Sequence, residues 1–274
     1  MTKRRGREWF DDESFWRDTY PFMFPQKRFA DASDEIGRIR RLVKPAGKKA
    51  LDLCCGPGRF AVSLARKGFT VTGVDKTAFL LRKAKALARA AGVRVEWVKS
   101  DMRDFVRPEG FDLVLSMFTS FGYFDDKEED RLVLKNVLAN LRAGGALLME
   151  LLGKERLARV LRATTSDVLP DGSMLVQRHK IFDDWTRIRN EWTLIRKGRA
   201  RTYCFHQTIY SGQELRERLE AAGFVDVRLY GDLDGRAYGP DALRLVAVGR
   251  RPPAPRDRTG LQTRAPGRRR RNRA

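Results

Sequence analysis

The sequence predicts an α/β fold, in which helices cover an open, mainly parallel sheet and a small antiparallel sheet is inserted late in the chain. Two patterns carry this prediction. Between residues 49 and 151, short apolar runs alternate with longer helical patterns, which is typical of βαβ units. Between residues 174 and 210, apolar and polar residues alternate in three runs separated by turn residues, which is typical of antiparallel strands.

The elements follow from these patterns. The strands of the parallel part are expected at Lys49–Cys54, Thr70–Val74, Arg94–Val98, Phe111–Met117 and Ala146–Leu151. The helices between them are expected at Arg59–Lys67, Ala78–Ala91 and Glu128–Leu141. After the antiparallel runs, a helix from Ser211 to Gly223 precedes two consecutive strands, Phe224–Tyr230 and Leu243–Val248, which close the sheet.

Composition excludes several classes of protein. The 274 residues hold no apolar run of membrane-spanning length, and the first residues lack the apolar stretch of a signal peptide. The cysteines Cys54, Cys55 and Cys204 are odd in number, and two adjacent cysteines rarely form a disulfide. His179 and His206 are the only histidines, so no Cys/His metal site is expected. We therefore expect a cytoplasmic protein, monomeric or homodimeric, with neither a metal nor a membrane partner.

The formal net charge of +21 is unevenly distributed, since the ten arginines and one acid from Arg250 to Ala274 contribute +9 of it. The segment 251–274 is rich in Arg, Pro and Gly and has almost no large apolar side chains, which predicts a disordered tail. Arginines in such a tail can bind nucleic acid through its phosphates. A tail that is simply solvated is the interpretation we favour.

The glycine loop predicts an adenosine cofactor. GPGRFA, at residues 56–61, fits the G-x-G-x-x-A pattern of a strand-to-helix turn, in which backbone N–H groups bind anions. NAD and S-adenosylmethionine (SAM) both fit this pattern. Asp52, Asp75 and Asp101 end three successive strands, and this set favours SAM. The loop after Gly56 would bind the methionine carboxylate, Asp75 the ribose hydroxyls and Asp101 the adenine amino group.

Five segments resemble the motifs of class I SAM-dependent methyltransferases: LDLCCGPGR, VTGVD, VKSDMRDF, FDLVLSMFTSFGYF and LRAGGALLMEL. The resemblance covers about residues 50–152. It implies a Rossmann-like seven-stranded sheet, SAM as the cofactor and S-adenosylhomocysteine (SAH) as the product. By this resemblance the cofactor residues are Gly56, Gly58, Asp75, Asp101 and Met102, to which we add Asp52, Cys54, Lys76 and Ser116.

The segment SDMRDF…SMFTSFGY is also similar to amino-sugar N-methyltransferases, which likewise carry an antiparallel insertion after the fifth strand. The ending at residues 230–250 resembles a different and broad bacterial branch, which leaves the acceptor open. The chain then divides into an aromatic helical lid (1–46), a SAM-binding core (47–152), an inserted sheet that covers the substrate (153–210), the closing helix and strands of the core (211–250) and the tail (251–274).

The two adjacent cysteines are expected to be small wall residues of the cofactor loop rather than nucleophiles. For catalysis, His206 is the candidate base because imidazole titrates near neutral pH. Tyr20 is the second candidate, from a set of N-terminal aromatic residues that could cover the sulfonium. Phe118 and Phe121 would form apolar walls for the acceptor, and Tyr238 would meet it from the turn between the last two strands. For all of these, a purely structural role is the alternative.

The sequence thus predicts a methyltransferase that acts on an oxygen or nitrogen of a small-molecule acceptor. An RNA or protein methyltransferase that uses the basic tail is one alternative, and a catalytically inactive nucleic-acid-binding protein with this fold is another. The fourth motif contains SMFT and lacks the Asn/Asp-Pro-Pro-aromatic motif of enzymes that methylate base amino groups, which argues against that substrate.

Overall fold

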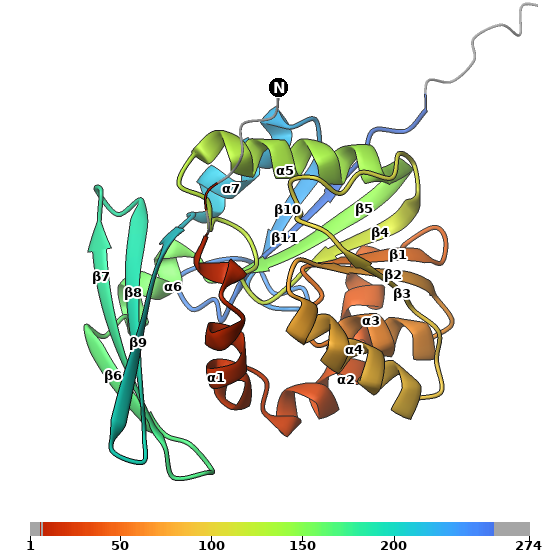
Figure 1. Cartoon of the computed structure of the whole chain (residues 1–274). Helices are drawn as coiled ribbons and strands as arrows, with labels where there is room; N and C mark the ends of the chain where they lie inside the picture. Colours follow the sequence, from red (N-terminus) through yellow and green to blue (C-terminus); the bar gives the residue numbers. More distant parts are fainter. Residues whose placement is uncertain (1–5, 7, 255–274) are drawn as a thin grey trace, which may run out of the picture.

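The expected α/β fold with an inserted antiparallel sheet is confirmed. The structure is a computed structural model that describes Gly6 and residues 8–254 (Figure 1). Seven strands form the main sheet in the order β10-β11-β5-β4-β1-β2-β3, and β11 runs antiparallel to both of its neighbours. The strands of this sheet are β1 (Lys49–Leu53), β2 (Thr70–Asp75), β3 (Glu96–Lys99), β4 (Phe111–Ser116), β5 (Leu141–Leu151), β10 (Val225–Tyr230) and β11 (Leu245–Arg250).

Helices cover both faces of the main sheet. One face packs against α5 (Lys127–Asn140) and α7 (Gly212–Ala221), and the other against α2 (Gln26–Val43), α3 (Arg59–Arg66) and α4 (Ala78–Ala90). The helix starts are capped locally. Asp126 accepts a hydrogen bond from Glu128 N–H before α5, and Ser211 and Glu214 form a capping box before α7. This arrangement leaves the carboxyl ends of the parallel strands free to form a site.

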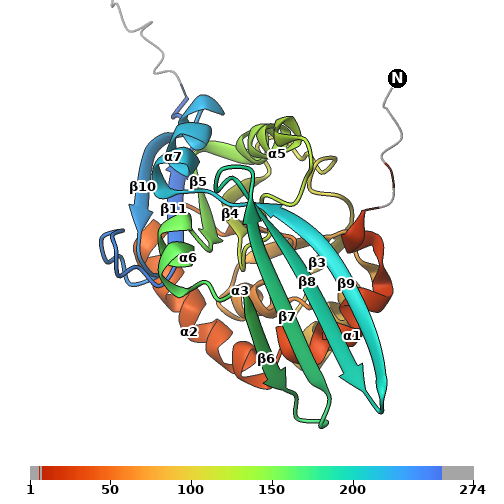
Figure 2. The ribbon, with the colours of Figure 1, turned by 90° about the vertical axis from the view of Figure 1, so that its left-hand side faces the viewer.

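The inserted sheet has four strands rather than the three that the sequence predicts. It follows α6 (Lys154–Val160) and has the order β6 (Thr164–Val168), β7 (Met174–Phe182), β8 (Arg187–Arg196) and β9 (Arg199–Thr208). The sequence TTSDV of β6 has only one apolar residue, so its alternation is not visible, and pairing with β7 makes it a strand. Figure 2 shows this sheet standing in front of the core.

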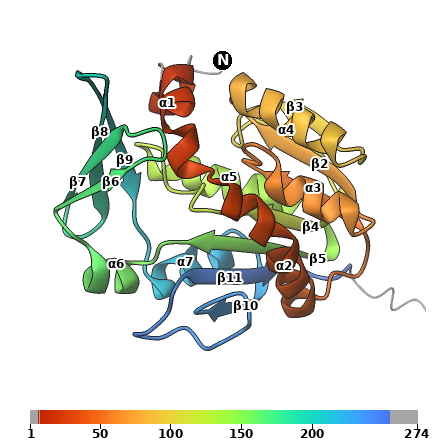
Figure 3. The same cartoon turned by 90° about the horizontal axis from the view of Figure 1, so that it is seen from below.

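The N-terminal residues divide into two parts. The 3₁₀ turn η1 (Trp9–Asp11) and helix α1 (Glu13–Met23) lie between the inserted sheet and the main sheet (Figures 1 and 3). Helix α2 instead belongs to the core, because its buried face packs against the main sheet through Ala32, Ile36, Ile39 and Val43. Only η1 and α1 are therefore in a position to cover a site beside the inserted sheet.

Most of the predicted Arg-rich tail lies outside the described residues, which end at position 254. Over the described residues, none of the helices has both the length and the apolar character needed to cross a bilayer.

The glycine loop provides a test of how tightly α3 packs against its neighbours. Gly58 has φ +81°, and a Cβ built there would lie 2.7 Å from Trp97 Cη2 and 2.9 Å from Ala84 Cβ. Gly92 has φ +65°, but a Cβ there would meet nothing within 4 Å.

Left-handed backbone costs an L-residue about 1–2 kcal/mol, and overpacking costs about 1–3 kcal/mol more. We expect Gly92→Ala to lower the free energy of unfolding by about 1 kcal/mol and Gly58→Ala by about 3 kcal/mol. Denaturant unfolding measures both values, and equal losses would show that the close packing at Gly58 is relaxed at little cost.

Candidate active site

One carboxylate holds the glycine loop in place. Asp75 ends β2 and is 7% exposed. One of its oxygens accepts a hydrogen bond from Gly56 N–H and the other from Thr77 N–H, each at 2.8 Å. The loop has left-handed backbone at Cys54, Gly56 and Gly58 (φ 58°, 54° and 81°), so it turns sharply after β1. The loop is thereby tied to the carboxyl end of the neighbouring strand.

A cavity opens at this edge of the main sheet. Its wall is formed by the ends of β1 and β2, by the loops that follow β1, β2, β3 and β4, by the first residues of α3 and α4, and by the N-terminal segment 9–24. The wall carries three carboxylates, Asp52, Asp75 and Asp101. It also carries a set of aromatic rings: Trp9, Phe10, Trp16, Phe24, Phe118, Tyr123 and Phe124. A cavity with many apolar groups and a few well-placed polar ones is typical of a small-molecule site.

Two of the three carboxylates are nearly fully buried. Asp52 is 1% exposed, and one of its oxygens accepts a hydrogen bond from Ala61 N–H at 2.9 Å. Burial raises the pKa of Asp52 to about 7, although the Ala61 amide opposes this shift. Burial also raises the pKa of Asp75, against its hydrogen bonds from Thr77 and Gly56. Because charge is costly to bury, both carboxylates are suited to a ligand that brings positive charge or hydroxyl donors.

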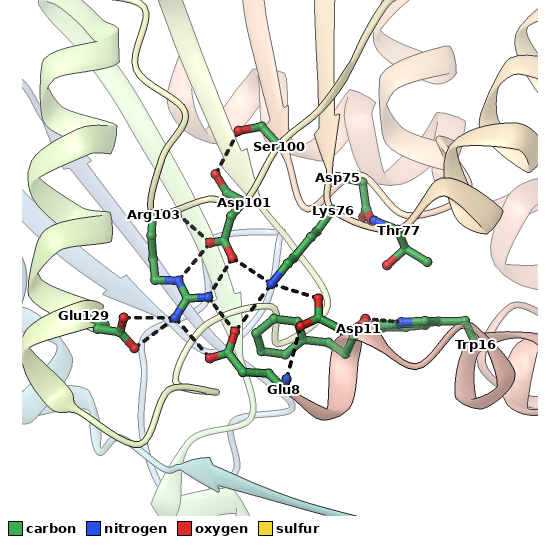
Figure 4. Close-up of polar contacts among 11 residues, drawn as sticks. Glu8, Asp11, Trp16, Asp75, Lys76, Thr77, Ser100, Asp101, Arg103 and Glu129 are labelled. Carbon is green, nitrogen blue, oxygen red and sulfur yellow. Dashed lines mark hydrogen bonds and ion pairs between the residues drawn. The ribbon is translucent and has the colours of Figure 1, made fainter. Parts of the chain in front are cut away.

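The third carboxylate is paired with cations. Asp101 accepts hydrogen bonds from Arg103 Nε at 3.0 Å and Nη2 at 2.7 Å, and Lys76 Nζ lies 3.2 Å from it (Figure 4). Burial alone would raise the pKa of Asp101, but Arg103 and Lys76 outweigh it and hold that pKa at about 2. Asp101 is therefore ionised at neutral pH and accepts hydrogen bonds.

Two guanidinium groups gather at Phe118, the aromatic residue that follows β4. The centroid of its ring lies 4.1 Å from Arg28 Cζ and 5.4 Å from Arg59 Cζ. Arg59 lines the cavity and pairs with Glu35 at 3.0 Å. Nη1 of Arg28 is buried without a hydrogen-bond partner among the described residues. Burial, together with the charge of Arg59, lowers the pKa of Arg28. A bound anion would satisfy this buried donor.

Comparisons with known proteins agree with this geometry. Residues 50–145 match a family model described as a methyltransferase domain. A protein of Geobacillus sp. strain WCH70, whose name assigns it to the methyltransferases, is 24% identical over 227 residues, which cover 78% of this chain and 89% of that protein.

The fold is shared with two solved structures. A SAM-dependent methyltransferase from Clostridium acetobutylicum ATCC 824 has a TM-score of 0.72 at 16% identity, covering 88% of this chain and 98% of that one. The sugar N-methyltransferase KedS8 from Streptoalloteichus sp. ATCC 53650 has a TM-score of 0.68 at 20% identity, covering 92% of this chain and 97% of that one.

The match over residues 50–145 and the shared fold support a class I SAM-dependent methyltransferase. Its cofactor is SAM, which supplies the methyl group and leaves as SAH. The main sheet has the seven strands that the sequence resemblance implies, and its two closing strands follow α7, with β11 placed between β5 and β10. The inserted antiparallel sheet also follows β5, as expected.

The cavity of the methyltransferase contains most of the residues expected for the cofactor. The expected cofactor residues in its wall are Asp52, Cys54, Gly56, Asp75, Lys76, Asp101 and Met102, and Phe118, which is expected to meet the acceptor, also lines it. Burial and the charge of Asp75 raise the pKa of the Cys54 thiol, and burial likewise raises that of Cys55. Both thiols are therefore protonated at neutral pH, as suits wall residues rather than nucleophiles.

Three expected residues near the loops lie behind the cavity wall. Gly58 caps α3 and packs against Trp97 and Ala84, so its role is close packing. Ser116 is buried at the end of β4, and Met117 is the first residue after it to line the cavity. Phe121 turns into the core, where its ring lies 5.6 Å from that of Tyr210.

Two expected tyrosines also lie outside the cavity wall. Tyr20 is on α1 and packs against Phe24 and Phe79, at centroid distances of 5.4 and 5.8 Å. Tyr238, in the turn between β10 and β11, donates a hydrogen bond to Glu155 at the start of α6. Neither hydroxyl is placed to meet an acceptor in this cavity.

The expectation that His206 lies beside the reacting methyl group does not hold in the structure. His206 is exposed on β9, and its ring meets that of Phe182 edge-on at 5.5 Å. Its neighbour Phe205 is buried on the opposite face and stacks on Trp9 at 4.7 Å. Because successive side chains of a strand alternate between faces, the sheet turns Phe205 toward the cavity side and His206 away from it.

Two cationic residues of the site, Arg59 and Arg103, were not predicted from the sequence. Arg59 belongs to the glycine loop motif itself, and Arg103 lies two residues after Asp101 in SDMRDF. In both cases the arginine lies inside a motif assigned to the cofactor, and this position could have identified it as a residue of the site. Their partners, Glu35 and Glu8, come from parts of the chain that no local pattern connects to them.

We expect His206→Ala to leave methyl transfer unchanged, with kcat and KM within about twofold of wild type, because an exposed side chain on the far face of β9 touches no reactant. Loss of a general base would instead lower kcat by about a hundredfold or more. Phe205→Ala is the matched control, since it removes a ring that packs on Trp9 of the cavity wall and should raise KM. Initial rates of both variants decide between these outcomes.

Proposed function

We propose that this methyltransferase acts on an oxygen or nitrogen atom of a small-molecule acceptor. The observation that carries this proposal is the aromatic enclosure of the cavity. Trp9, Phe10 and Trp16 approach from the N-terminal segment, and Tyr123 and Phe124 from the loop after β4. The inserted sheet supports the enclosure from outside through Phe205. Such a cavity suits a small acceptor better than a nucleic acid or protein chain, and the fold likeness to a sugar N-methyltransferase agrees with it.

The residues of the cavity suggest one orientation for the cofactor, which we propose as follows. We place the adenine beside Asp101 and Met102, and the ribose hydroxyls at Asp75. The methionine part would lie over the loop at Gly56. A Cβ at this position would lie 3.6 Å from Phe24 Cζ and would narrow the cavity there. Arg28 lies outside the wall but contacts Phe118 of the wall, and its buried Nη1 would then donate to the methionine carboxylate. Charged hydrogen bonds of this kind contribute about 1.5–3 kcal/mol each.

Methyl transfer from SAM requires little from the protein beyond alignment of the acceptor with the methyl group. The sulfonium of SAM already activates the methyl carbon for displacement. The chain has to align the acceptor and exclude water, which can supply about 7–11 kcal/mol. The aromatic rings of the wall serve the second task. Burial raises the pKa of Tyr123, so its hydroxyl stays protonated. Among the described residues that line the cavity there is no histidine, so we propose that the acceptor binds with its nucleophile already unprotonated.

Labelled methyl from SAM tests this proposal against its alternatives. We expect label to enter small amines or phenols and not RNA or protein, because the cavity is enclosed on the acceptor side. The measurement compares incorporation into pools of each class with full-length protein. Label found only in RNA or protein would contradict the small-molecule proposal and favour the basic tail as a substrate-binding element.

The pH dependence of SAH binding tests the role of Asp52. We propose that the ionised carboxylate receives the methionine ammonium. The pKa of Asp52 in the free protein is about 7, so below that pH the proton must leave before the ammonium is bound. The affinity for SAH should therefore be constant above pH 7 and fall by up to about tenfold for each unit below it. Asp52→Asn should flatten this profile between pH 6 and 8. Calorimetric titrations at several pH values measure it, and an unchanged slope in the variant would rule out Asp52 as the titrating group.

A further inference from the structure

A cluster of charged residues joins the N-terminal turn to the adenosine side of the cavity. Arg103 is its centre, and its side chain is fully buried. Three carboxylates from three separate elements pair with it: Glu8 next to η1, Asp101 after β3 and Glu129 on α5 (Figure 4). Lys76 adds further ion pairs to Asp11, Asp101 and Glu8 at 2.8, 3.2 and 3.4 Å.

We propose that Arg103 is a positioning residue that closes the N-terminal turn over the cofactor. In the closed arrangement the guanidinium binds Glu8 in bidentate fashion, at 3.0 Å from Nη1 and 2.6 Å from Nη2. Bidentate pairs of this kind are both strong and directional. The proposal rests on the proposed function only through the placement of the adenine at Asp101.

These ion pairs hold the N-terminal turn, residues 8–11, over the cavity, and we call this turn the cover. Glu8 and Asp11 form a capping box around η1, so the two acids are fixed relative to each other. Between them in the sequence, Trp9 and Phe10 line the cavity. Pairing of Glu8 and Asp11 with the cations of the core therefore fixes both rings over the site. When the turn lifts, the rings leave with it.

The carboxylate of Asp101 takes part both in the proposed binding of the cofactor and in the proposed closure of the N-terminal turn. Asp101, the proposed adenine acceptor, is held by two nitrogens of the same guanidinium that binds Glu8. The guanidinium thus orients Asp101 toward the ligand on one side and binds the cover on the other. The Arg103 Cζ also lies 4.1 Å from the ring centroid of Phe124, another residue of the cavity wall. A cofactor that leaves the closed cavity must displace a turn held by these contacts.

Glu8 and Glu129 allow a matched experiment, because each gives one carboxylate to Arg103 but only Glu8 belongs to the cover. We expect Glu8→Gln to increase the dissociation rate of SAH by about tenfold or more, which corresponds to the loss of one charged hydrogen-bonded pair. Glu129→Gln should change that rate by less than about threefold, since α5 does not move with the turn. Stopped-flow tryptophan fluorescence after displacement of SAH measures both rates, because Trp9 and Trp16 line the cavity.

Hydrogen exchange of the unliganded proteins gives a second readout. Glu8→Gln should speed exchange over residues 8–24, and Glu129→Gln should leave that segment as in wild type. Equal effects of the two variants on the dissociation rate, or no effect of Glu8→Gln, would overturn the proposal, because Arg103 would then only stabilise the fold. If wild-type protein failed to bind SAH at all, the proposed function itself would fail, and the exchange data would still report on the cover.

Discussion

The carboxylate of Asp75 is the interaction on which the site depends. Its two oxygens accept hydrogen bonds from Gly56 N–H in the glycine loop and from Thr77 N–H before α4. The loop can make this contact only because its backbone enters the left-handed region at Cys54 and Gly56. One side chain thus joins the ends of β1 and β2, and the same residue is part of the cavity wall. Loop shape and ligand chemistry are set by the same two oxygens.

The covering elements depend on this core through packing and charge. On one side, the stack of Trp9 on Phe205 and the hydrogen bond from Tyr203 to Asp18 join the N-terminal segment to the inserted sheet. On the other side, Arg103 joins it to the main sheet. The N-terminal segment is therefore held between two bodies by two different interactions. The stack of Trp9 on Phe205 is insensitive to salt and pH, whereas the charged cluster at Arg103 is proposed to respond to the ligand.

The sequence was most informative where local chemistry dictates structure. The glycines of GPGRFA identified the loop, and acids at the ends of strands identified Asp75 and Asp101. Both signals are local, because they do not depend on distant residues. Contacts between distant segments, such as Glu8 with Arg103, left no local pattern. The error at His206 is of a third kind. Alternation along β9 does separate His206 from Phe205, but which face turns toward the cavity follows from the docking of the inserted sheet on α1.

Calorimetry with SAH on two aspartate variants tests the central claim most directly. Asp112 is the matched control for Asp75, since it also accepts a backbone hydrogen bond, from Lys49 N–H at 2.9 Å, but it lies near the amino end of β4, whereas the cavity lies at the carboxyl ends of the strands. We predict that Asp75→Ala weakens SAH binding by about a hundredfold, as the loss of two ribose hydrogen bonds requires, while Asp112→Ala leaves it within about twofold. Unchanged affinity in Asp75→Ala, or equally tight binding of NAD by the wild-type protein, would contradict the account.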